Sequence, residues 1–313
     1  MAITCIITSF KEPKSTLKAV KAVLGQKGLS VKEKKELKVI VVDPFPETEE
    51  FLKANLKSDK VEFFLDPGEG KSYALNLLFQ ERDSGNKEDI WILTDGDVYI
   101  SDNAVKEIAD KFKDEKVGCV TAKVVNLDGR ETKYGFWADV AFAGVDKVRK
   151  RLSSQKKLFE CSGYLFAIRQ GVLFDFPTGT SEDSIIPWLF WKRGYGVAYA
   201  DKAEVYVKNP ENWKDYALQK VRNIKAHENL NTIAPDMKKA RTKSFFNEIK
   251  EGSLFVLSQV RSPRELFWAL QLYFARLYIY LLAFRDLRTK KSYQDGWRGN
   301  GLTESTSLEG KES

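Results

Sequence analysis

Residues 91–98 have the sequence WILTDGDV, an apolar run that ends in Asp95, Gly96 and Asp97. Short apolar runs bounded by polar residues or glycine are typical of buried strands, so residues 90–93 are predicted to form one. Side chains two positions apart on an extended backbone project to the same side, which would let Asp95 and Asp97 converge on a hard cation such as Mg²⁺ or Mn²⁺. The alternative interpretation is a simple turn, because Asp-Gly is common in turns.

Comparable apolar runs lie on both sides of this segment. Further strands are predicted at residues 3–8, 39–42, 61–65 and 117–125, with helix-length amphipathic stretches between them. Strands that are apolar throughout and are joined by helices predict an α/β fold, in which a mostly parallel central sheet is flanked by helices. Ligands bind such sheets beyond the carboxyl ends of the strands, so the residues that follow each strand are the candidate site residues.

The composition restricts the class of protein. The chain has 313 residues, of which 43% are hydrophobic and 12% aromatic, and this excludes a wholly disordered or collagen-like protein. Its net charge is 51 minus 44, or +7, with both signs interleaved. This excess indicates solubility first and attraction to phosphate groups as an alternative. We expect no nucleic-acid partner, because no recognised binding motif accompanies the charge.

Cysteine and histidine are both scarce. Cys5, Cys119 and Cys161 form no CxxC pair and are odd in number, so neither a disulfide framework nor a zinc site is expected. With no secretion signal at residues 1–9, a cytoplasmic location is predicted. His227 is the only histidine, so mechanisms that need a histidine cluster are excluded and carboxylates become the candidate acid or base groups. His227 itself is more typical of a surface residue than of a metal ligand.

The middle of the chain has a weaker pattern. Residues 126–157 are rich in Gly, Asp and Lys, which predicts an irregular binding loop or lid. After it, CSGYLFAIR at residues 161–169 indicates a strand, residues 185–192 a helix, residues 196–207 two short strands, and residues 213–228 a basic helix.

The C-terminal part differs in character. A main domain is predicted over residues 1–235, a helical segment over 236–291 and a disordered tail over 292–313. Residues 266–284 are apolar on nearly every side, with Gln271 and Arg276 as the strongly polar exceptions, and basic residues follow directly. Three interpretations remain open for residues 264–291: a helix lying on a membrane surface, a helix packed on protein, or a membrane span.

Glu182 and Asp183 form a second acidic pair, in TGTSEDSIIPW just before a predicted helix. Acidic residues there stabilise the helix dipole, with Thr180 or Ser181 as the cap, so simple capping is one interpretation. The functional alternative makes one carboxylate a general base. One acidic pair for a metal and another for proton transfer is what sugar transfer from a nucleotide donor requires.

A glycine-rich segment, DPGEGKSYALN at residues 66–76, lies between a predicted strand and a helix. Gly68 and Gly70 permit tight backbone geometry, and Lys71 could reach a phosphate group. The letters GKS also end a P-loop, which makes a nucleotide hydrolase an alternative function. The P-loop pattern needs a glycine where this chain has Leu65, and this mismatch counts against that alternative.

In this order, these segments resemble the family 2 glycosyltransferases of the GT-A fold over most of residues 3–229. CIITSFKEP resembles the family's first strand and turn, VIVVD the strand that ends in a nucleotide-binding acid, and GKSYALN the GK-x-x-ALN segment. TDGDV is similar to the Asp-x-Asp metal motif, CSGYLFAIR to the strand and loop on the acceptor side, and SEDSIIPW to the Glu-Asp motif. QKVRN is similar to Gln-x-x-Arg-Trp, although Asn223 replaces the tryptophan.

The resemblance implies an inverting, metal-dependent transferase with a small helical appendage. Such an enzyme moves a sugar from a nucleotide-diphosphate sugar to an acceptor hydroxyl or phosphate, and the acceptor is a saccharide or a lipid-linked molecule. Asp183 would be the catalytic base and Glu182 its neighbour, while Asp95 and Asp97 would hold Mg²⁺ or Mn²⁺. Ser162 and Gly163 would line the acceptor side. The implied donor-binding residues are Thr8, Ser9, Glu12, Asp43, Lys71, Asn76, Asp95, Gln219 and Arg222.

The sequence departs from the family pattern at two places. Ser9, Phe10 and Lys11 replace the usual first-loop residues, and Asn223 puts processive polymer synthesis in doubt. Besides the nucleotide hydrolase, a non-catalytic module that binds a sugar nucleotide or a membrane remains an alternative. If residues 264–291 lie on a membrane, the enzyme would be peripheral on its inner face.

Overall fold

A computed structural model describes residues 1–239, 252 and 254–288, and the predicted tail over residues 292–313 lies outside them. The strands are β1 (Ile3–Thr8), β2 (Lys38–Asp43), β3 (Val61–Leu65), β4 (Ile90–Asp95), β5 (Tyr99–Ile100), β6 (Val117–Asn126), β7 (Leu165–Arg169) and β8 (Gly196–Val207). The helices are α1 (Pro13–Leu24), α2 (Val31–Glu36), α3 (Pro46–Asn55), α4 (Lys71–Arg82), α5 (Ala104–Lys111), α6 (Lys133–Ser154), α7 (Glu182–Lys192), α8 (Trp213–Ile233), the 3₁₀ helix η1 (Pro235–Lys239) and α10 (Pro263–Arg288).

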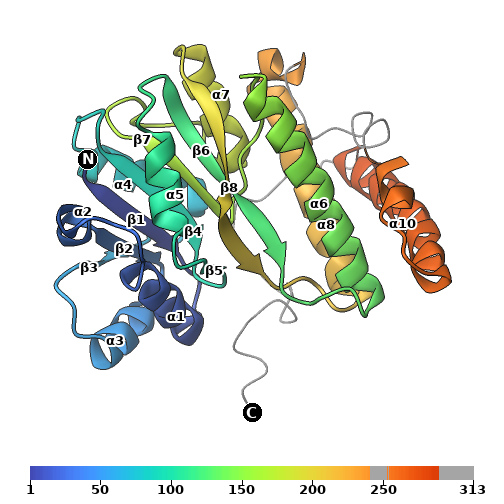
Figure 1. Cartoon of the computed structure of the whole chain (residues 1–313), viewed down its shortest axis with the longest axis horizontal. Coiled ribbons are helices and arrows are strands. Elements are labelled where there is room, and N and C mark those ends of the chain that lie inside the picture. The colour runs from blue at the N-terminus through green and yellow to red at the C-terminus, as the bar shows by residue number, and fades with distance from the viewer. Residues whose placement is uncertain (240–251, 253, 289–313) are drawn as a thin grey trace.

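One mixed sheet forms the centre of the molecule, in the order β3-β2-β1-β4-β7-β6-β8-β5 (Figure 1). Strands β3, β2, β1 and β4 are parallel, as the sequence predicted for the first half of the chain. Strand β7 is antiparallel to both β4 and β6, so its amino end lies at the edge of the sheet where β1 and β4 end. This inversion brings residues 161–164 to the carboxyl end of β4.

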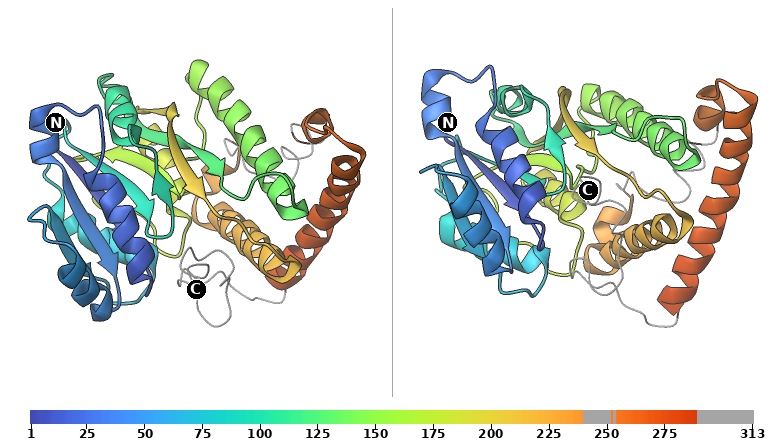
Figure 2. Two further views of the ribbon diagram at one scale, coloured as in Figure 1. Left: turned by 60° about the horizontal axis from the view of Figure 1, so that its bottom comes forward. Right: turned by 90° about the horizontal axis from the view of Figure 1, so that it is seen from below.

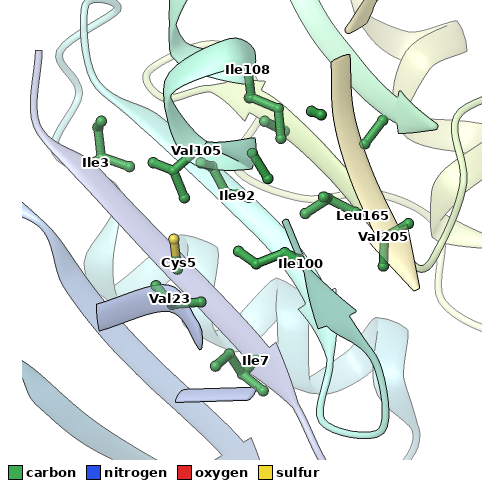
Figure 3. Packing of buried hydrophobic residues seen from close by; sticks show 14 of the residues in the cluster. Ile3, Cys5, Ile7, Val23, Ile92, Ile100, Val105, Ile108, Leu165 and Val205 are labelled. Carbon is green, nitrogen blue, oxygen red and sulfur yellow. The ribbon is translucent and has the colours of Figure 1, made fainter. Parts of the chain in front are cut away.

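Helices cover both faces of the sheet because its strands alternate their apolar side chains between two cores. On one face, Ile3, Cys5 and Ile7 of β1 belong to the same buried cluster as Val105 and Ile108 of α5 (Figure 3). Ile6 of β1 points to the other face and joins the cluster formed with α4 and α7. This period of two is what a strand buried on both sides requires.

The irregular lid predicted over residues 126–157 is wrong, because most of this segment forms the 22-residue helix α6. Thr132 caps the helix by accepting a hydrogen bond from the Gly135 amide, and Phe136, Trp137 and Val140 are buried at helical spacing. Their partners are α8 and α10 rather than the sheet. The apolar stripe is narrow and basic residues surround it, so composition obscured the periodicity.

Strand β8 corrects a second expectation. The two short strands predicted over residues 196–207 form one 12-residue strand, which pairs with β6 in parallel. The pairing register shifts between Ala122 and Lys123 of β6. Residues 201–203 of β8 have no partner in this register, and Asp201 and Lys202 among them are polar. This explains why the apolar pattern of the strand is interrupted in its middle.

Helix α10 forms the end of the molecule opposite the N-terminus and lies alongside α6 and α8 (Figures 1 and 2). A helix was predicted here. Its buried residues are Ala269, Leu272, Ala275, Ile279, Tyr280 and Ala283, which form a third cluster with α6 and α8. Small alanine side chains let the helix axes approach closely, so α10 is attached to the main body along most of its length.

Candidate active site

The candidate site lies at the carboxyl ends of the parallel strands. The last residue of β1, Thr8, pairs in register with Asp95, the last residue of β4. The Thr8 hydroxyl donates a hydrogen bond to Asp95 Oδ1 over 3.0 Å. From the inverted strand, Tyr164 accepts a hydrogen bond from the Thr94 hydroxyl over 2.8 Å, which ties the start of β7 to the end of β4. Strand pairing therefore places these segments at one edge of the sheet.

Lys71 joins the two acidic pairs that the sequence singled out. Gly70 has a φ of 111°, a backbone conformation that favours glycine, and α4 begins directly after it at Lys71. The Lys71 ammonium lies 2.8 Å from Asp95 Oδ1 and 2.7 Å from Glu182 Oε1, and all three side chains are less than one-fifth exposed. The stretches around residues 95 and 182 therefore meet across one cation.

This arrangement perturbs both partners. Burial acts to lower the pKa of Lys71, but the adjacent Asp95 and Glu182 carboxylates outweigh it, so the pKa of the ammonium is raised. Burial raises the pKa of Glu182, the nearby Asp183 adds to that effect, and Lys71 opposes it. A buried carboxylate next to a second one needs such a cation to remain ionised. Lys71 thus stabilises the charged form of Glu182.

Asp183 has different surroundings from those of Glu182. Its side chain is half-buried, and Oδ1 accepts hydrogen bonds from the hydroxyls of Ser181 and, over 3.4 Å, Ser184. The Asp183 carbonyl accepts a 2.9 Å bond from the Cys161 amide. A Cβ atom built on Gly163 would lie 3.7 Å from Glu182 Oε1 and 3.9 Å from the Asp183 carboxyl carbon, so this segment, which was predicted for the acceptor side, lies against both acids.

Asp97 does not lie on an extended backbone, so the argument that placed it beside Asp95 is wrong. Strand β4 ends at Asp95, and Gly96 and Asp97 form a turn, as the alternative interpretation proposed. Asp97 is half-buried. Gly96 is buried, and its amide donates a 2.8 Å hydrogen bond to the Thr8 carbonyl, which fixes the turn against β1.

We expect Gly96→Ala to damage this turn. A Cβ atom there would lie 2.8 Å from Thr16 Oγ1 and 3.1 Å from Ser9 Cβ, and these two residues already share a 2.6 Å hydrogen bond. Such overpacking should lower the free energy of unfolding by about 1–3 kcal/mol in urea titrations. Gly196→Ala is the matched control, because its Cβ atom would meet only the Lys116 carbonyl at 3.6 Å. Equal stability of the two variants would contradict the tight packing.

The acidic side chains fit a hard divalent cation. Carboxylate oxygens are the ligands that Mg²⁺ and Mn²⁺ prefer. Within the described residues, no three His, Cys, Asp or Glu side chains gather as a metal site. If Asp95 and Asp97 hold a cation, as the family resemblance implies, substrate phosphate oxygens and water would supply the remaining ligands, which is how Mg²⁺ usually binds at phosphate-processing sites.

Ser9, Glu12 and Asp43 order the loops around this site. The fully buried Asp43 carboxylate accepts hydrogen bonds from the amides of Lys11 at 3.1 Å and Phe45 at 2.8 Å. The Glu12 carbonyl accepts a 2.7 Å bond from the Thr16 hydroxyl, which also pairs with Ser9. The bond from Lys11 to Asp43 joins the loops after β1 and β2, and the bonds of Thr16 order the first of these loops.

Asn76 and Ser162 likewise make internal contacts. The Asn76 amide donates a 2.7 Å hydrogen bond to the Phe176 carbonyl and accepts a 3.0 Å bond from the Phe176 amide. Buried Ser162 donates through its backbone amide to the Thr121 hydroxyl over 2.9 Å. Both residues therefore hold neighbouring backbone segments in place through these hydrogen bonds.

Gln219 and Arg222 lie on α8, and the described residues show no hydrogen bond or ion pair between them and the acidic cluster. Helix α8 reaches the site region through Asn229, which donates a 2.8 Å hydrogen bond to the Gly179 carbonyl ahead of α7. Gln219 and Arg222 lie about 10–15 Å before Asn229 along the helix axis. His227 is half-buried on the same helix.

Sequence reasoning missed Arg149, which lies in the basic run KVRKR. Its side chain is buried on α6, and Nη2 donates a 3.3 Å hydrogen bond to the carbonyl of Glu160, next to Cys161. Burial lowers the pKa of Arg149, and the nearby Cys161 and Asp183 oppose that effect. The helical spacing of Trp137, Val140 and Leu152 was the signal that could have identified this helix.

The mixed sheet with helices on both faces has the GT-A fold, as comparison with solved structures shows. The mannosyltransferase PcManGT from Pyrobaculum calidifontis, in complex with GDP-Man and Mn²⁺, has a TM-score of 0.57 and 17% identity, over 92% of this chain and 72% of its own. GalNAc-T7 with UDP, GalNAc and Mn²⁺ has a TM-score of 0.45 and 16% identity, over 66% of this chain and 43% of its own. No curated protein sequence matches the chain.

The particular family follows from the sequence itself. The model of glycosyltransferase-like family 2 matches residues 2–226, so the chain belongs to that family. The matched range contains all the predicted site residues. With the family assigned, the P-loop hydrolase alternative loses its basis.

Proposed function

We propose that this protein is an inverting glycosyltransferase that uses a nucleotide-diphosphate sugar. The observation that supports this most is the Lys71 bridge, which brings Asp95 and Glu182 to one edge of the sheet. In the proposed reaction an acceptor oxygen attacks the anomeric carbon, the bond from that carbon to the diphosphate breaks, and the acceptor proton passes to a carboxylate. The structure supports this division of labour because the two acidic pairs have different environments.

Asp183 is the proposed base. It is more exposed than Glu182, and two serine hydroxyls orient its Oδ1. Both acids lie against Gly163 on the predicted acceptor side, so this contact does not distinguish them. A general base must be accessible to its substrate and held in one orientation. Glu182 is held by Lys71 instead, so its proposed role is to position that cation.

Lys71 and the Asp95–Asp97 turn are the proposed diphosphate site. The Lys71 ammonium can shift from the carboxylates to the phosphate oxygens, where it offsets the charge that develops on the leaving group. A divalent cation held by Asp95 and Asp97 would neutralise further negative charge on the diphosphate. Thr8 orients Asp95 for this role through its 3.0 Å hydrogen bond.

The other predicted donor residues are proposed to act on the loops. Ser9, Glu12 and Asp43 order the segments after β1 and β2, and Asn76 fixes the loop ahead of α7. Gln219 and Arg222 would contact the diphosphate or the acceptor only if α8 moves toward the acidic residues or the substrate extends from those residues to α8. A cytoplasmic enzyme on the inner face of a membrane, with a lipid-linked acceptor, is the version of this function that fits the apolar helix α10.

A thermal-shift panel tests the donor and the metal together. UDP-, GDP- and dTDP-sugars are each added with and without Mn²⁺; the mannosyltransferase neighbour binds GDP-Man with Mn²⁺. We expect at least one donor to raise the melting temperature only when Mn²⁺ is present. That shift should disappear in Asp97→Ala and persist in Asp201→Asn, an exposed acid on β8. Equal shifts in the wild type and Asp97→Ala would remove the metal assignment.

A second measurement separates an enzyme from a binding module. Sugar release from the stabilising donor should depend on Asp183 while donor binding should not. A protein that binds donor yet neither transfers nor hydrolyses it, with Asp183→Asn unchanged, would be a non-catalytic module.

A further inference from the structure

Helix α10 has two apolar sides, and one of them packs on the rest of the described chain while the other is largely exposed. The inward side carries the alanines and the other buried residues that pack on α6 and α8. The outward side, which we call the α10 outer face, consists of large exposed residues: Leu266, Phe267, Leu270, Phe274, Leu277, Tyr278, Leu281 and Phe284. At about 100° per residue these positions occupy about one-third of the helix circumference.

The exposure of this face is large and continuous. Phe274 is 74% and Leu281 61% exposed, although both side chains are strongly hydrophobic. Isolated apolar residues on a surface are ordinary, whereas a contiguous patch of eight indicates an interaction site. The described residues leave this side of α10 open along about five turns, from Leu266 to Phe284.

Charged residues fix the orientation of the helix at both ends. Near its start, the guanidinium of Arg130 makes two hydrogen bonds to the Glu265 carboxylate, at 3.2 and 3.1 Å. Near its end, the Lys225 ammonium lies 3.9 Å from Asp286 Oδ2. Each acid of α10 thus has a partner from outside the helix, Arg130 for Glu265 and Lys225 for Asp286. The helix cannot turn its outer face inward without breaking both pairs.

The charges left at the exposed ends are positive. Arg261 and Arg264 are exposed beside the start of the helix, and the Arg285 side chain is 70% exposed beside its end. No acidic residue lies on the α10 outer face. Trp213 and Tyr278 contact each other at its margin, with ring centroids 6.0 Å apart. An apolar face with aromatic residues at its margin and arginines at its ends complements an anionic bilayer surface.

The helix is long enough to cross a bilayer, but its packing argues against that orientation. An 18-residue window within Pro263–Asp286 has a mean hydropathy of 1.4, which meets the requirement for a span by length and composition only. A third of that window is buried inside the protein, against α6 and α8. Crossing a membrane would require α10 to leave these helices or carry their charged surfaces into lipid, which is costly.

We propose that the α10 outer face docks this protein on anionic membranes, with α10 parallel to the bilayer plane and its large side chains inserted among the lipid headgroups and upper acyl chains. The buried side of the helix stays on α6 and α8, so the glycosyltransferase domain lies directly above the surface. Docking does not depend on the proposed reaction. It would deliver the enzyme to acceptors anchored in lipid.

Vesicle co-sedimentation of the full-length protein without donor or metal tests this directly. The vesicles are phosphatidylcholine alone, or phosphatidylcholine with about one-third phosphatidylglycerol. We expect binding to the anionic vesicles that weakens in high salt and is much lower on the neutral ones. The double variant Phe274→Glu/Leu281→Glu should bind the anionic vesicles at least about 30-fold more weakly, because both side chains would carry a charge into the interface.

The controls separate docking from folding and from other occupants. Phe174→Glu places the same substitution at a 51% exposed phenylalanine before α7, and it should bind like the wild type. Melting curves and donor-induced thermal shifts should be the same in all three proteins, so a defect in docking is distinguishable from a failed site. Wild-type protein that ignores anionic vesicles would overturn the proposal. So would a wild-type dimer that the double variant converts to monomer without a change in vesicle binding, or extraction from vesicles only by detergent, which indicates a span.

Discussion

Asp183→Asn should lower kcat for sugar transfer about 1,000-fold while leaving donor affinity within a few-fold of the wild type. General bases contribute about 10²–10⁴-fold, and an amide cannot take the acceptor proton. The substitution keeps the size of the side chain and can still accept the hydrogen bonds of Ser181 and Ser184. Initial-rate kinetics on the donor found by thermal shift, with melting curves of the variant, would measure both effects.

Two further variants test whether Asp183, and not Glu182, is the general base. Asp201→Asn, the same change at an exposed acid on β8, should have wild-type kinetics. Glu182→Gln removes a charge held by Lys71 and should raise the donor KM more than it lowers kcat. A larger loss of kcat in Glu182→Gln than in Asp183→Asn would exchange the roles of the two acids. Equal activity of Asp183→Asn and the wild type would exclude the proposed base.

Lys71→Met should lower both stability and activity. Removing the ammonium leaves Glu182 and Asp95 buried at one edge without their shared cation, and breaking a buried pair in this way costs about 3–5 kcal/mol. The same change removes a positive charge from the proposed leaving-group site, so kcat/KM should fall about 100-fold or more. Urea unfolding and initial-rate kinetics measure the two effects separately.

The pH dependence of that stability loss has a definite sign. Lys71 opposes the burial that raises the pKa of Glu182, so without it this pKa rises further. A carboxyl with a raised pKa in the folded state binds protons more tightly there than in the unfolded chain, so its ionisation lowers stability as pH increases. The stability deficit of Lys71→Met relative to the wild type should therefore be largest above the folded-state pKa of Glu182. It should shrink as the pH falls through it.

A matched ion pair provides the control. Lys123 lies 2.8 Å from Glu204 between β6 and β8, away from the acidic cluster and about one-third exposed. Lys123→Met should cost less than about 1 kcal/mol and leave kcat/KM unchanged. Lys71→Arg retains the charge and should recover part of the stability. If Lys71→Met loses stability but keeps kcat/KM, Lys71 is a structural counter-ion and not part of the leaving-group site.

The first half of the fold was predictable from local pattern. The strands at residues 3–8 and 61–65 match β1 and β3. Strand β1 is buried on both faces and therefore reads as a short, continuous apolar run. Helix α6 was not predictable in this way. Its buried aromatic residues contact other helices, and Gly, Asp, Lys and Arg interrupt its apolar residues along the sequence.

For the candidate site, the residue types were readable but their contacts were not. Asp95, Lys71 and the Glu182–Asp183 pair each follow a strand or begin a helix, which is where chemistry accumulates in α/β folds. Asp43 and Asn76 were also singled out, yet their side chains hold neighbouring loops by hydrogen bonds. Sequence cannot distinguish a polar residue that faces a ligand from one that braces the backbone, because both need the same donors and acceptors.

Local sequence alone therefore specified most of the strands, several of the helices, the acidic pairs and the apolar character of residues 266–284. The tertiary structure determined which of these segments contact one another and which surfaces stay exposed. The inverted strand β7 carried residues 161–163 to the end of β4, and Lys71 joined acids 87 positions apart in the chain. Packing on α6 and α8 selected which side of α10 stays exposed. These outcomes depend on contacts between distant segments, and no short window of sequence contains both partners.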